Sequence, residues 1–200
     1  MPAGETALLR YLNRNGYQLR NQAAAYRQLK KARVAVDVGS HIGLWSRHMA
    51  SLFRQVVAFE PMRVARDCYV LNVSMDKVVL YGCALGAEAG NVLMRYNPEL
   101  SMETVVHTVM GGGEGVEICT LDSFALDEVD LVKIDVEGYE PFVIEGARDT
   151  IERCRPVVVI EQKGHGAEWG FERYAALRML MEMGMLPRDC VVDDVVMVWP

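Results

Sequence analysis

Glycines and acidic residues follow the first two apolar runs of this sequence, where they could bind a small polar ligand. The segment Asp37-Val-Gly39-Ser-His-Ile-Gly43 follows a run that begins at Val34, and Glu60 ends the next run, 21 residues beyond Gly39. A glycine turn lets the backbone approach a ligand closely. A carboxylate at the end of the neighbouring strand can accept hydrogen bonds from both hydroxyls of a ribose. Together these features predict a nucleoside site.

The glycine spacing indicates which nucleoside-containing ligands suit this turn. Three residues separate Gly39 from Gly43, whereas a dinucleotide site uses G-x-G-x-x-G to seat a pyrophosphate on a helix N-terminus. A nucleoside without a pyrophosphate therefore fits better, and S-adenosylmethionine (SAM) is the commonest such ligand. A nicotinamide-dependent oxidoreductase shares the predicted fold and is an alternative, but it would need the missing third glycine.

A second set of polar residues, Lys133, Asp135 and Glu137, alternates along a later apolar run. Alternate residues of a strand share one face, so we expect these side chains to lie together near the end of the strand. Asp135 and Glu137 are then candidates to orient or deprotonate a hydroxyl of a substrate bound at this edge. The alternative is an internal network in which Lys133 neutralises a carboxylate and Glu137 caps the following helix.

The segment Glu161-Gln-Lys-Gly-His165 brings a carboxylate, an amide, an ammonium and an imidazole to the same edge. His165 could act as a general base near neutral pH. It could instead join Asp135, Glu137 and Glu161 around Mg²⁺ or a similar hard cation, or belong to an ordinary polar surface loop. A divalent metal is therefore an open alternative, and no residue is assigned to it alone.

Further contacts to SAM are predicted from position along the chain. Met62 could pack on the adenine face or fill the core. The adenine edge should pass Cys83 and Ala84, where backbone groups would bind its amine because no acidic side chain is available. The predicted SAM-binding residues are Asp37, Gly39, Ser40, His41, Gly43, Glu60, Pro61, Met62, Cys83, Ala84 and Asp135, and the predicted catalytic residues are Asp135, Glu137 and His165.

These residues meet only if strands and helices alternate along the chain. Short β-branched runs predict parallel strands covered on both faces, and 3.6-residue spacing predicts the helices between them. We expect strands over about 34–39, 56–60, 78–81, 129–136 and 156–161, with helices over about 42–53, 61–73, 139–153 and 168–183. Strand-like runs over 186–192 and 195–199 flank Asp193-Asp194, which predicts an antiparallel hairpin. The fold class is therefore α/β, with a doubly wound, mostly parallel seven-stranded sheet and an antiparallel C-terminal edge hairpin.

Two regions depart from this alternation. Residues 1–33 carry seven Lys or Arg against one acid, Glu5, so residues 1–32 are predicted to form a basic helical segment with helices near 7–12 and 22–32. The rest, 33–200, would form one domain that contains the doubly wound sheet and a small β insertion at about 90–120. Within it we expect strands over 92–96, 104–110 and 116–119, and either a substrate lid or a plain hairpin turn formed by Tyr96, His107 and the glycine-rich loop 111–115.

Composition excludes several classes of protein. With 200 residues, 51% hydrophobic and 24% charged, the chain is neither disordered nor fibrous. No apolar stretch approaches the roughly 20 residues of a membrane-spanning helix, and the lack of an apolar leader predicts a cytoplasmic protein. The net charge of −6 disfavours specific nucleic-acid binding. Five cysteines without a Cys-x-x-Cys motif argue against a disulfide framework and against structural zinc.

Eight segments carry a family resemblance that covers about residues 33–165. They are Val36-Asp-Val-Gly-Ser-His-Ile-Gly43, Phe59-Glu-Pro61, Leu71-Asn72, Ala84-Leu-Gly86, Leu121-Asp-Ser123, Val132-Lys-Ile-Asp-Val-Glu-Gly-Tyr-Glu140, Glu145-Gly-Ala147 and Pro156-Val-Val-Val-Ile-Glu161. In these segments the chain resembles the FkbM family of SAM-dependent methyltransferases. The resemblance implies a class I, Rossmann-like fold and O-methylation of a sugar or another small hydroxylated compound. His41 stands where that family usually has asparagine.

The expected partner is a small hydroxylated acceptor, with no specific nucleic acid and no membrane span. The methionines at 179, 181, 183 and 185 suit a core or a hydrophobic interface, so a homodimer is left open. A basic N-terminal segment could contact an anionic substrate, RNA or a membrane surface, although the charges favour a solvated helix face. A non-catalytic binding module of the same fold is a further alternative.

Overall fold

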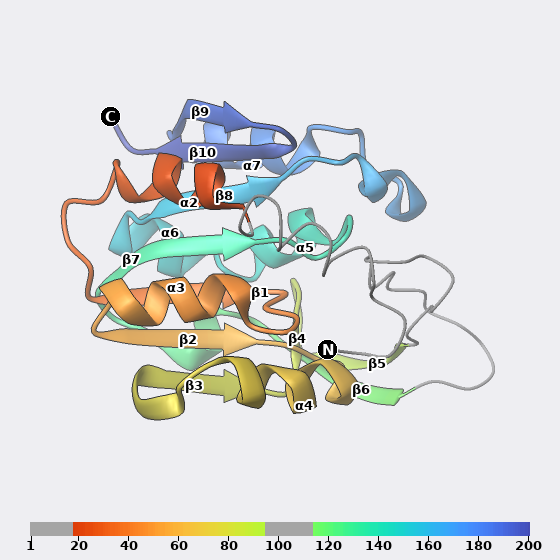
Figure 1. Ribbon diagram of the computed structural model, residues 1–200. Helices are drawn as coiled ribbons and strands as arrows, with labels where there is room; N and C mark the ends of the chain where they lie inside the picture. The colour runs from red at the N-terminus through yellow and green to blue at the C-terminus, as the bar shows by residue number, and fades with distance from the viewer. Residues whose placement is uncertain (1–17, 95–113) are drawn as a thin grey trace.

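The computed structural model of this chain describes residues 18–94 and 114–200, and its centre is a seven-stranded sheet (Figure 1). The strand order is β3-β2-β1-β7-β8-β10-β9. The strands are β1 (Val34–Val38), β2 (Gln55–Phe59), β3 (Val78–Tyr81), β7 (Val129–Ile134), β8 (Val157–Glu161), β9 (Leu186–Val191) and β10 (Asp194–Val198). The first five run parallel, and β10 pairs antiparallel with both β8 and β9. The predicted sheet and its edge hairpin are confirmed.

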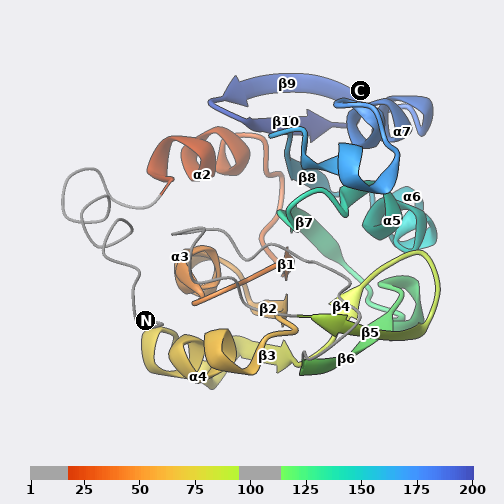
Figure 2. The same ribbon diagram turned by 90° about the vertical axis from the view of Figure 1, so that its right-hand side faces the viewer.

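Helices cover both faces of the sheet, as Figure 2 shows from the carboxyl ends of the parallel strands. One face carries α2 (Leu19–Tyr26), α3 (Leu44–Leu52) and α4 (Arg63–Asn72), and the other carries α5 (Glu140–Glu145), α6 (Arg148–Cys154) and α7 (Ala175–Glu182). All residues of β1 and β8 are buried. Continuous β-branched runs are stable as strands here because helices shield both faces of the sheet from water.

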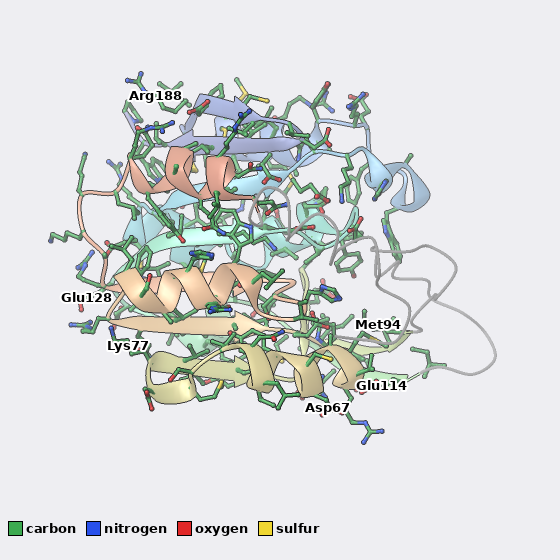
Figure 3. All side chains as sticks on the ribbon, viewed as in Figure 1. Asp67, Lys77, Met94, Glu114, Glu128 and Arg188 are labelled. Carbon is green, nitrogen blue, oxygen red and sulfur yellow. The ribbon has the colours of Figure 1, made fainter. Side chains whose placement is uncertain are left out.

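A second, three-stranded sheet lies beside the first, in the order β4-β6-β5. It comprises β4 (Ala84–Leu85), β5 (Gly90–Met94) and β6 (Glu114–Cys119), with β5 and β6 antiparallel. Figure 3 labels Met94 and Glu114, the residues at which the described part of this insertion ends. The predicted strand over 104–110 lies outside the described residues, as do Tyr96, His107, most of the glycine-rich loop and the predicted helix over 7–12.

The predicted helix over 139–153 is wrong in one respect, because two helices, α5 and α6, replace it. In a continuous helix the carbonyl oxygen of Gly146 would accept the N–H of Thr150. Here Asp122 forms hydrogen bonds with both of these backbone groups instead. Its own N–H donates to Gly146 O at 3.0 Å, and its carboxylate Oδ1 accepts the Thr150 N–H at 2.8 Å. A residue from a distant segment therefore interrupts the helix.

Two other helices are shorter than predicted. The helix expected over 168–183 is α7, which begins at Ala175, because Gly170 adopts the left-handed conformation (φ +81°) after the 3₁₀ segment His165–Trp169. The helix expected over 22–32 is α2, which ends at Tyr26 in tightened i→i+3 hydrogen bonds. All five cysteines are free, as predicted. Within the described ranges, no helix has the length and apolar character needed to cross a membrane.

Candidate active site

A cleft opens beyond the carboxyl ends of β1, β2, β7 and β8, where the strand order reverses direction between β1 and β7. It encloses about 1380 Å³ of space, including its open mouth. Sheets of this kind bind ligands at such a reversal. Nine of the predicted residues line the cleft: Gly39, Ser40, His41, Glu60, Pro61, Cys83, Ala84, Asp135 and Glu137. Four do not: Asp37, Gly43, Met62 and His165.

Glu60 lies at one end of the cleft and is only 4% exposed. Its Oε2 accepts the backbone N–H of His41 at 2.8 Å, and its Oε1 accepts that of Met62 at 2.8 Å. Burial raises the pKa of Glu60, and these two hydrogen bonds oppose the rise. Because a carboxylate has about four acceptor positions, two bonds leave capacity for a ligand diol.

Gly39 lies where the loop after β1 meets the end of β7. It has a φ of +74°, and a Cβ built on it would lie 1.9 Å from the carbonyl oxygen of Asp135. Only glycine permits the loop after β1 to approach the end of β7 so closely. Gly43 serves helix packing instead, since a Cβ built on it would collide with Val73 and Tyr69. It lets α3 pack closely against α4, which explains why it lies outside the cleft.

Asp37 lies beneath the cleft and is fully buried. Its Oδ2 accepts the Ser46 hydroxyl at 2.6 Å, and its Oδ1 lies 3.7 Å from Lys133 Nζ. Burial raises the pKa of Asp37, and the Lys133 ammonium opposes the rise. Lys133 Nζ also lies 3.2 Å from both Gly39 O and Asp135 Oδ2. The predicted network is thus present, and Asp37 supports the cleft through Lys133 instead of lining it.

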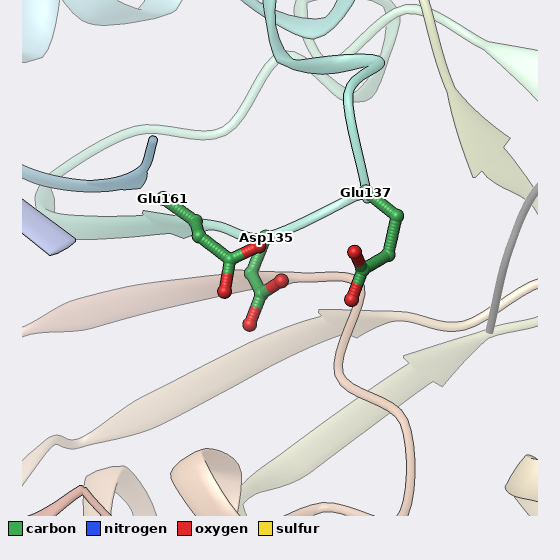
Figure 4. A group of neighbouring side chains, drawn as sticks. All are labelled: Asp135, Glu137 and Glu161. Atoms are coloured by element: carbon green, nitrogen blue, oxygen red, sulfur yellow. The ribbon is translucent and has the colours of Figure 1, made fainter. Parts of the chain in front are cut away.

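Three carboxylates gather at the other end of the cleft, at the ends of β7 and β8 (Figure 4). One oxygen from each of Asp135, Glu137 and Glu161 lies within 4.8 Å of the others. Burial, followed by the charge of Asp135, raises the pKa of Glu161 to about 10. Burial acts in the same direction on Asp135, but the ammonium groups of Lys133 and Lys163 outweigh it and lower the pKa of Asp135. Of this pair, Asp135 therefore ionises more readily than Glu161.

Lys163 lies among these carboxylates, with its Nζ 2.9 Å from Glu161 Oε1 and 3.5 Å from Glu137 Oε1. The spacing of the carboxylates would suit a divalent cation, but the ammonium groups of Lys133 and Lys163 already lie within 4 Å of them. His165, the fourth ligand of the predicted metal set, does not belong to this group of carboxylates in the described part of the chain, because it meets Glu137 alone.

Glu137 contacts His165 through a 2.8 Å hydrogen bond between Oε2 and Nδ1. Since β7 ends at Ile134 and Glu137 has a φ of +54°, the predicted strand alternation does not extend to it. The predicted cap is also wrong: Glu140 accepts the N–H groups of Val136 and Gly138 instead. His165 lies behind Glu137, because its backbone packs on Gly138, where a Cβ would be 2.6 Å from the carbonyl carbon of His165.

Sequence reasoning did not assign Lys163, Tyr139 or Trp169 to the site, yet all three line the cleft. Lys163 belongs to the polar segment after β8, which was a usable signal. Trp169 was expected within the helix over 168–183, and no sequence feature indicated that it would line the cleft. Met62, predicted to face the adenine, packs with Ala65, Met94 and Val116 in a small apolar cluster.

Most of this chain matches a known protein family. Residues 37–191 match the family described as the methyltransferase FkbM domain. Methyltransferase sdnD of Sordaria araneosa is 28% identical over 166 residues, a match that covers 62% of this chain and 64% of that protein. The chain therefore spans less than two thirds of this relative.

Solved structures show the same fold. The methyltransferase FkbM of Methylobacillus flagellatus KT superimposes with a TM-score of 0.57 at 16% identity, covering 84% of this chain and 44% of that one. A Streptococcus mutans protein in complex with SAH superimposes with a TM-score of 0.52 at 12% identity, covering 90% and 94%. At these identities the likeness shows the fold, which is that of the class I methyltransferases. With its family match spanning most of its length, this chain belongs to the methyltransferase FkbM domain family.

Proposed function

We propose that this chain transfers a methyl group from SAM to an oxygen of a small hydroxylated acceptor such as a sugar. The observation that carries the proposal is a single cleft with Glu60 at one end and the carboxylates Asp135 and Glu137 at the other. Membership of a methyltransferase family and the fold of the SAH-bound Streptococcus mutans protein support SAM as the donor.

The end of the cleft at Glu60 fits the adenosyl part of SAM. Glu60 has acceptor capacity for the ribose hydroxyls, as its two backbone hydrogen bonds leave lone pairs unused. The hydroxyl oxygen of Ser40 is buried, lines the cleft and has no hydrogen-bond partner among the described residues, so a bound ligand would satisfy it. An apolar wall suited to a purine ring includes Phe59, Cys83 and Leu85.

SAM, when bound, supplies a methyl group already activated on a positively charged sulfur. Asp135 would face that charge, because it lines the cleft and is held ionised by Lys133. An ionised carboxylate in a partly desolvated cleft stabilises a neighbouring cation strongly. Asp135 therefore contributes to holding the donor, which is a binding role as well as a catalytic one.

Glu137 is the residue we assign to the acceptor hydroxyl. It lines the cleft, whereas His165 does not, so Glu137 can accept the hydroxyl proton as the oxygen is methylated. His165 would orient the Glu137 carboxylate through its 2.8 Å hydrogen bond and is a positioning residue. Since the methyl group is already activated, alignment and exclusion of water supply much of the remaining rate.

Binding of SAM measured by calorimetry tests the donor assignment. Glu60→Gln keeps the size of the side chain and removes the charge, and we expect it to weaken SAM binding about 10- to 100-fold. The matched control is Asp122→Asn, since Asp122 also accepts two backbone N–H groups but lies outside the cleft. The control should bind SAM as the wild type does.

Two results would overturn the proposal. One is a wild-type protein that binds NADH but not SAM, which would point to the oxidoreductase. The other is equal weakening of SAM binding by Glu60→Gln and Asp122→Asn, which would mean that the variants act through stability alone.

A further inference from the structure

We infer that the acceptor is an uncharged hydroxylated ring that packs on Trp169 while its hydroxyls bind Glu137 and Lys163. This inference rests on the proposed function and narrows its substrate class. It assigns Trp169 a role in selecting the acceptor, and it excludes anionic acceptors such as uronates or sugar phosphates.

The apolar part of the subsite is an aromatic wall formed by Trp169 and Tyr139, both of which line the cleft. Their ring centroids are 5.1 Å apart and the planes meet at 77°. Phe142 contacts Trp169 in a similar edge-on geometry, with centroids 6.4 Å apart, and Phe171 packs on Phe142 at 4.9 Å. Such edge-to-face contacts are favourable in themselves, so Trp169 is supported from behind by rings that do not line the cleft.

Backbone contacts place this wall beside the polar groups. The close approach of Gly138 to the backbone of His165 and Gly166 joins the loop after β7 to the loop after β8. The Phe171 N–H donates to Gly166 O at 3.0 Å, which closes the turn that contains Trp169. Trp169 and Glu137 are therefore held in fixed relation before any ligand arrives, and such preorganisation lowers the entropy cost of binding.

Both ammonium groups in the polar part of the subsite already face carboxylates. Lys163 faces Glu137 and Glu161, at 3.5 and 2.9 Å. Lys133 faces Asp37 and Asp135, at 3.7 and 3.2 Å. In the described lining of this end, each ammonium already lies within 4 Å of two carboxylates, so an anionic acceptor would lose its hydration without gaining an uncommitted cation. Neutral hydroxyls can donate to a carboxylate and accept from an ammonium without this cost.

A ring fits this combination better than a linear polyol. One face of a pyranose ring presents C–H groups that pack on an aromatic surface, while its hydroxyls project from the rim. A linear polyol has more rotatable bonds to immobilise and no continuous apolar face, so it should bind more weakly. The aromatic wall and the charged side chains beside it therefore favour a ring-shaped acceptor over a linear polyol.

Binding measured by saturation-transfer NMR, with SAH present, tests the inference. The probes are a set of methyl pyranosides that differ in hydroxyl configuration, the methyl glycoside of glucuronic acid, and sorbitol. We expect at least one neutral pyranoside to bind roughly tenfold more tightly than both the glucuronide and sorbitol. If the glucuronide or sorbitol binds as tightly as every neutral pyranoside, the inference is wrong.

Variants of the wall separate recognition from stability. Trp169→Ala should weaken pyranoside binding about tenfold, and Trp169→Phe should restore most of it. The matched control, Trp199→Ala, removes an indole that lies outside the cleft and outside this aromatic cluster, and it should leave pyranoside binding unchanged. Equal losses in Trp169→Ala and Trp199→Ala would overturn the role of Trp169.

Calorimetry with SAM on the same samples keeps the two proposals apart. If SAM binds but the pyranosides show no preference, only the acceptor inference fails. If wild-type protein does not bind SAM, the proposed function fails, whatever the pyranosides do.

Discussion

The two ends of the cleft are built in different ways. At the Glu60 end, the residues that meet come from neighbouring segments, and the key bonds join one carboxylate to the backbone N–H groups of His41 and Met62. At the other end, side chains from two distant loops neutralise one another, as Lys163 does with Glu137. The first end depends on backbone conformation, and the second depends on charge pairing across the fold.

The two ends should therefore tolerate different substitutions. A backbone-built end should keep its shape when a single charge is removed, because the turn is held by glycine and main-chain bonds. A charge-paired end should fail when one partner is lost, since the remaining charge is left without compensation in a buried place. Substitutions at the charge-paired end test this contrast directly, and the most damaging of them removes a buried lysine.

Lys133→Met should produce the largest loss of stability. Lys133 is 5% exposed and faces Asp37 and Asp135, so its removal takes the nearby ammonium from two carboxylates. We expect the free energy of unfolding, measured by urea denaturation, to fall by about 3–5 kcal/mol. Adding Asp37→Asn to this variant should recover part of the loss. A double variant that shows the full sum of both single losses would contradict the pairing.

Glu137→Gln should lower catalysis more than it lowers stability. We expect kcat for methyl transfer to fall about 100-fold, with SAM affinity unchanged, because Glu137 would accept the proton of the acceptor. His165→Asn should cost only about tenfold, since His165 acts through Glu137. Steady-state rates of SAH formation check both values. A larger loss in His165→Asn than in Glu137→Gln would show that the roles are reversed.

Glu161→Gln should change the pH dependence of stability. Burial raises the pKa of Glu161 from its ordinary 4.5 to about 10. Between these values the folded protein therefore holds a proton that the unfolded chain releases, and stability falls as pH rises. Relative to Glu161→Gln, the wild type should lose about 1–2 kcal/mol between pH 6 and pH 8.

Urea denaturation at the two pH values measures this difference. The exposed Glu88→Gln serves as the control, and its loss should equal that of the wild type. Parallel pH profiles for the wild type and Glu161→Gln would show that Glu161 titrates as an ordinary carboxyl.

Local patterns in the sequence predicted the sheet well. Val34–Val38 and Val157–Glu161 are continuous apolar runs, and such runs form strands wherever helices cover both faces. The turn at Gly39 and the acid at Glu60 were also predictable, because both features depend on residues adjacent in sequence to the strands they follow. Gly39 and Glu60 both line the cleft because the parallel strands that they follow end at the same edge of the sheet.

Features that depend on distant segments were not predictable. Asp122 divides the helix expected over 139–153, since it takes hydrogen bonds that Gly146 and Thr150 would have exchanged. The alternative in which Glu137 caps a helix was wrong, because His165 and Lys163 contact it instead. No local pattern in the sequence predicts such partners, because each contact depends on two segments that lie far apart along the chain.

Short segments of the chain were enough to specify the α/β architecture and the end of the cleft at Glu60, since strand burial, glycine conformation and strand-end position are local properties. The other end was settled only in the folded molecule, where Lys163 neutralises the carboxylates, His165 lies behind Glu137 and Trp169 completes the wall. Charge pairing and aromatic packing act through space, between loops whose proximity exists only once the sheet has formed.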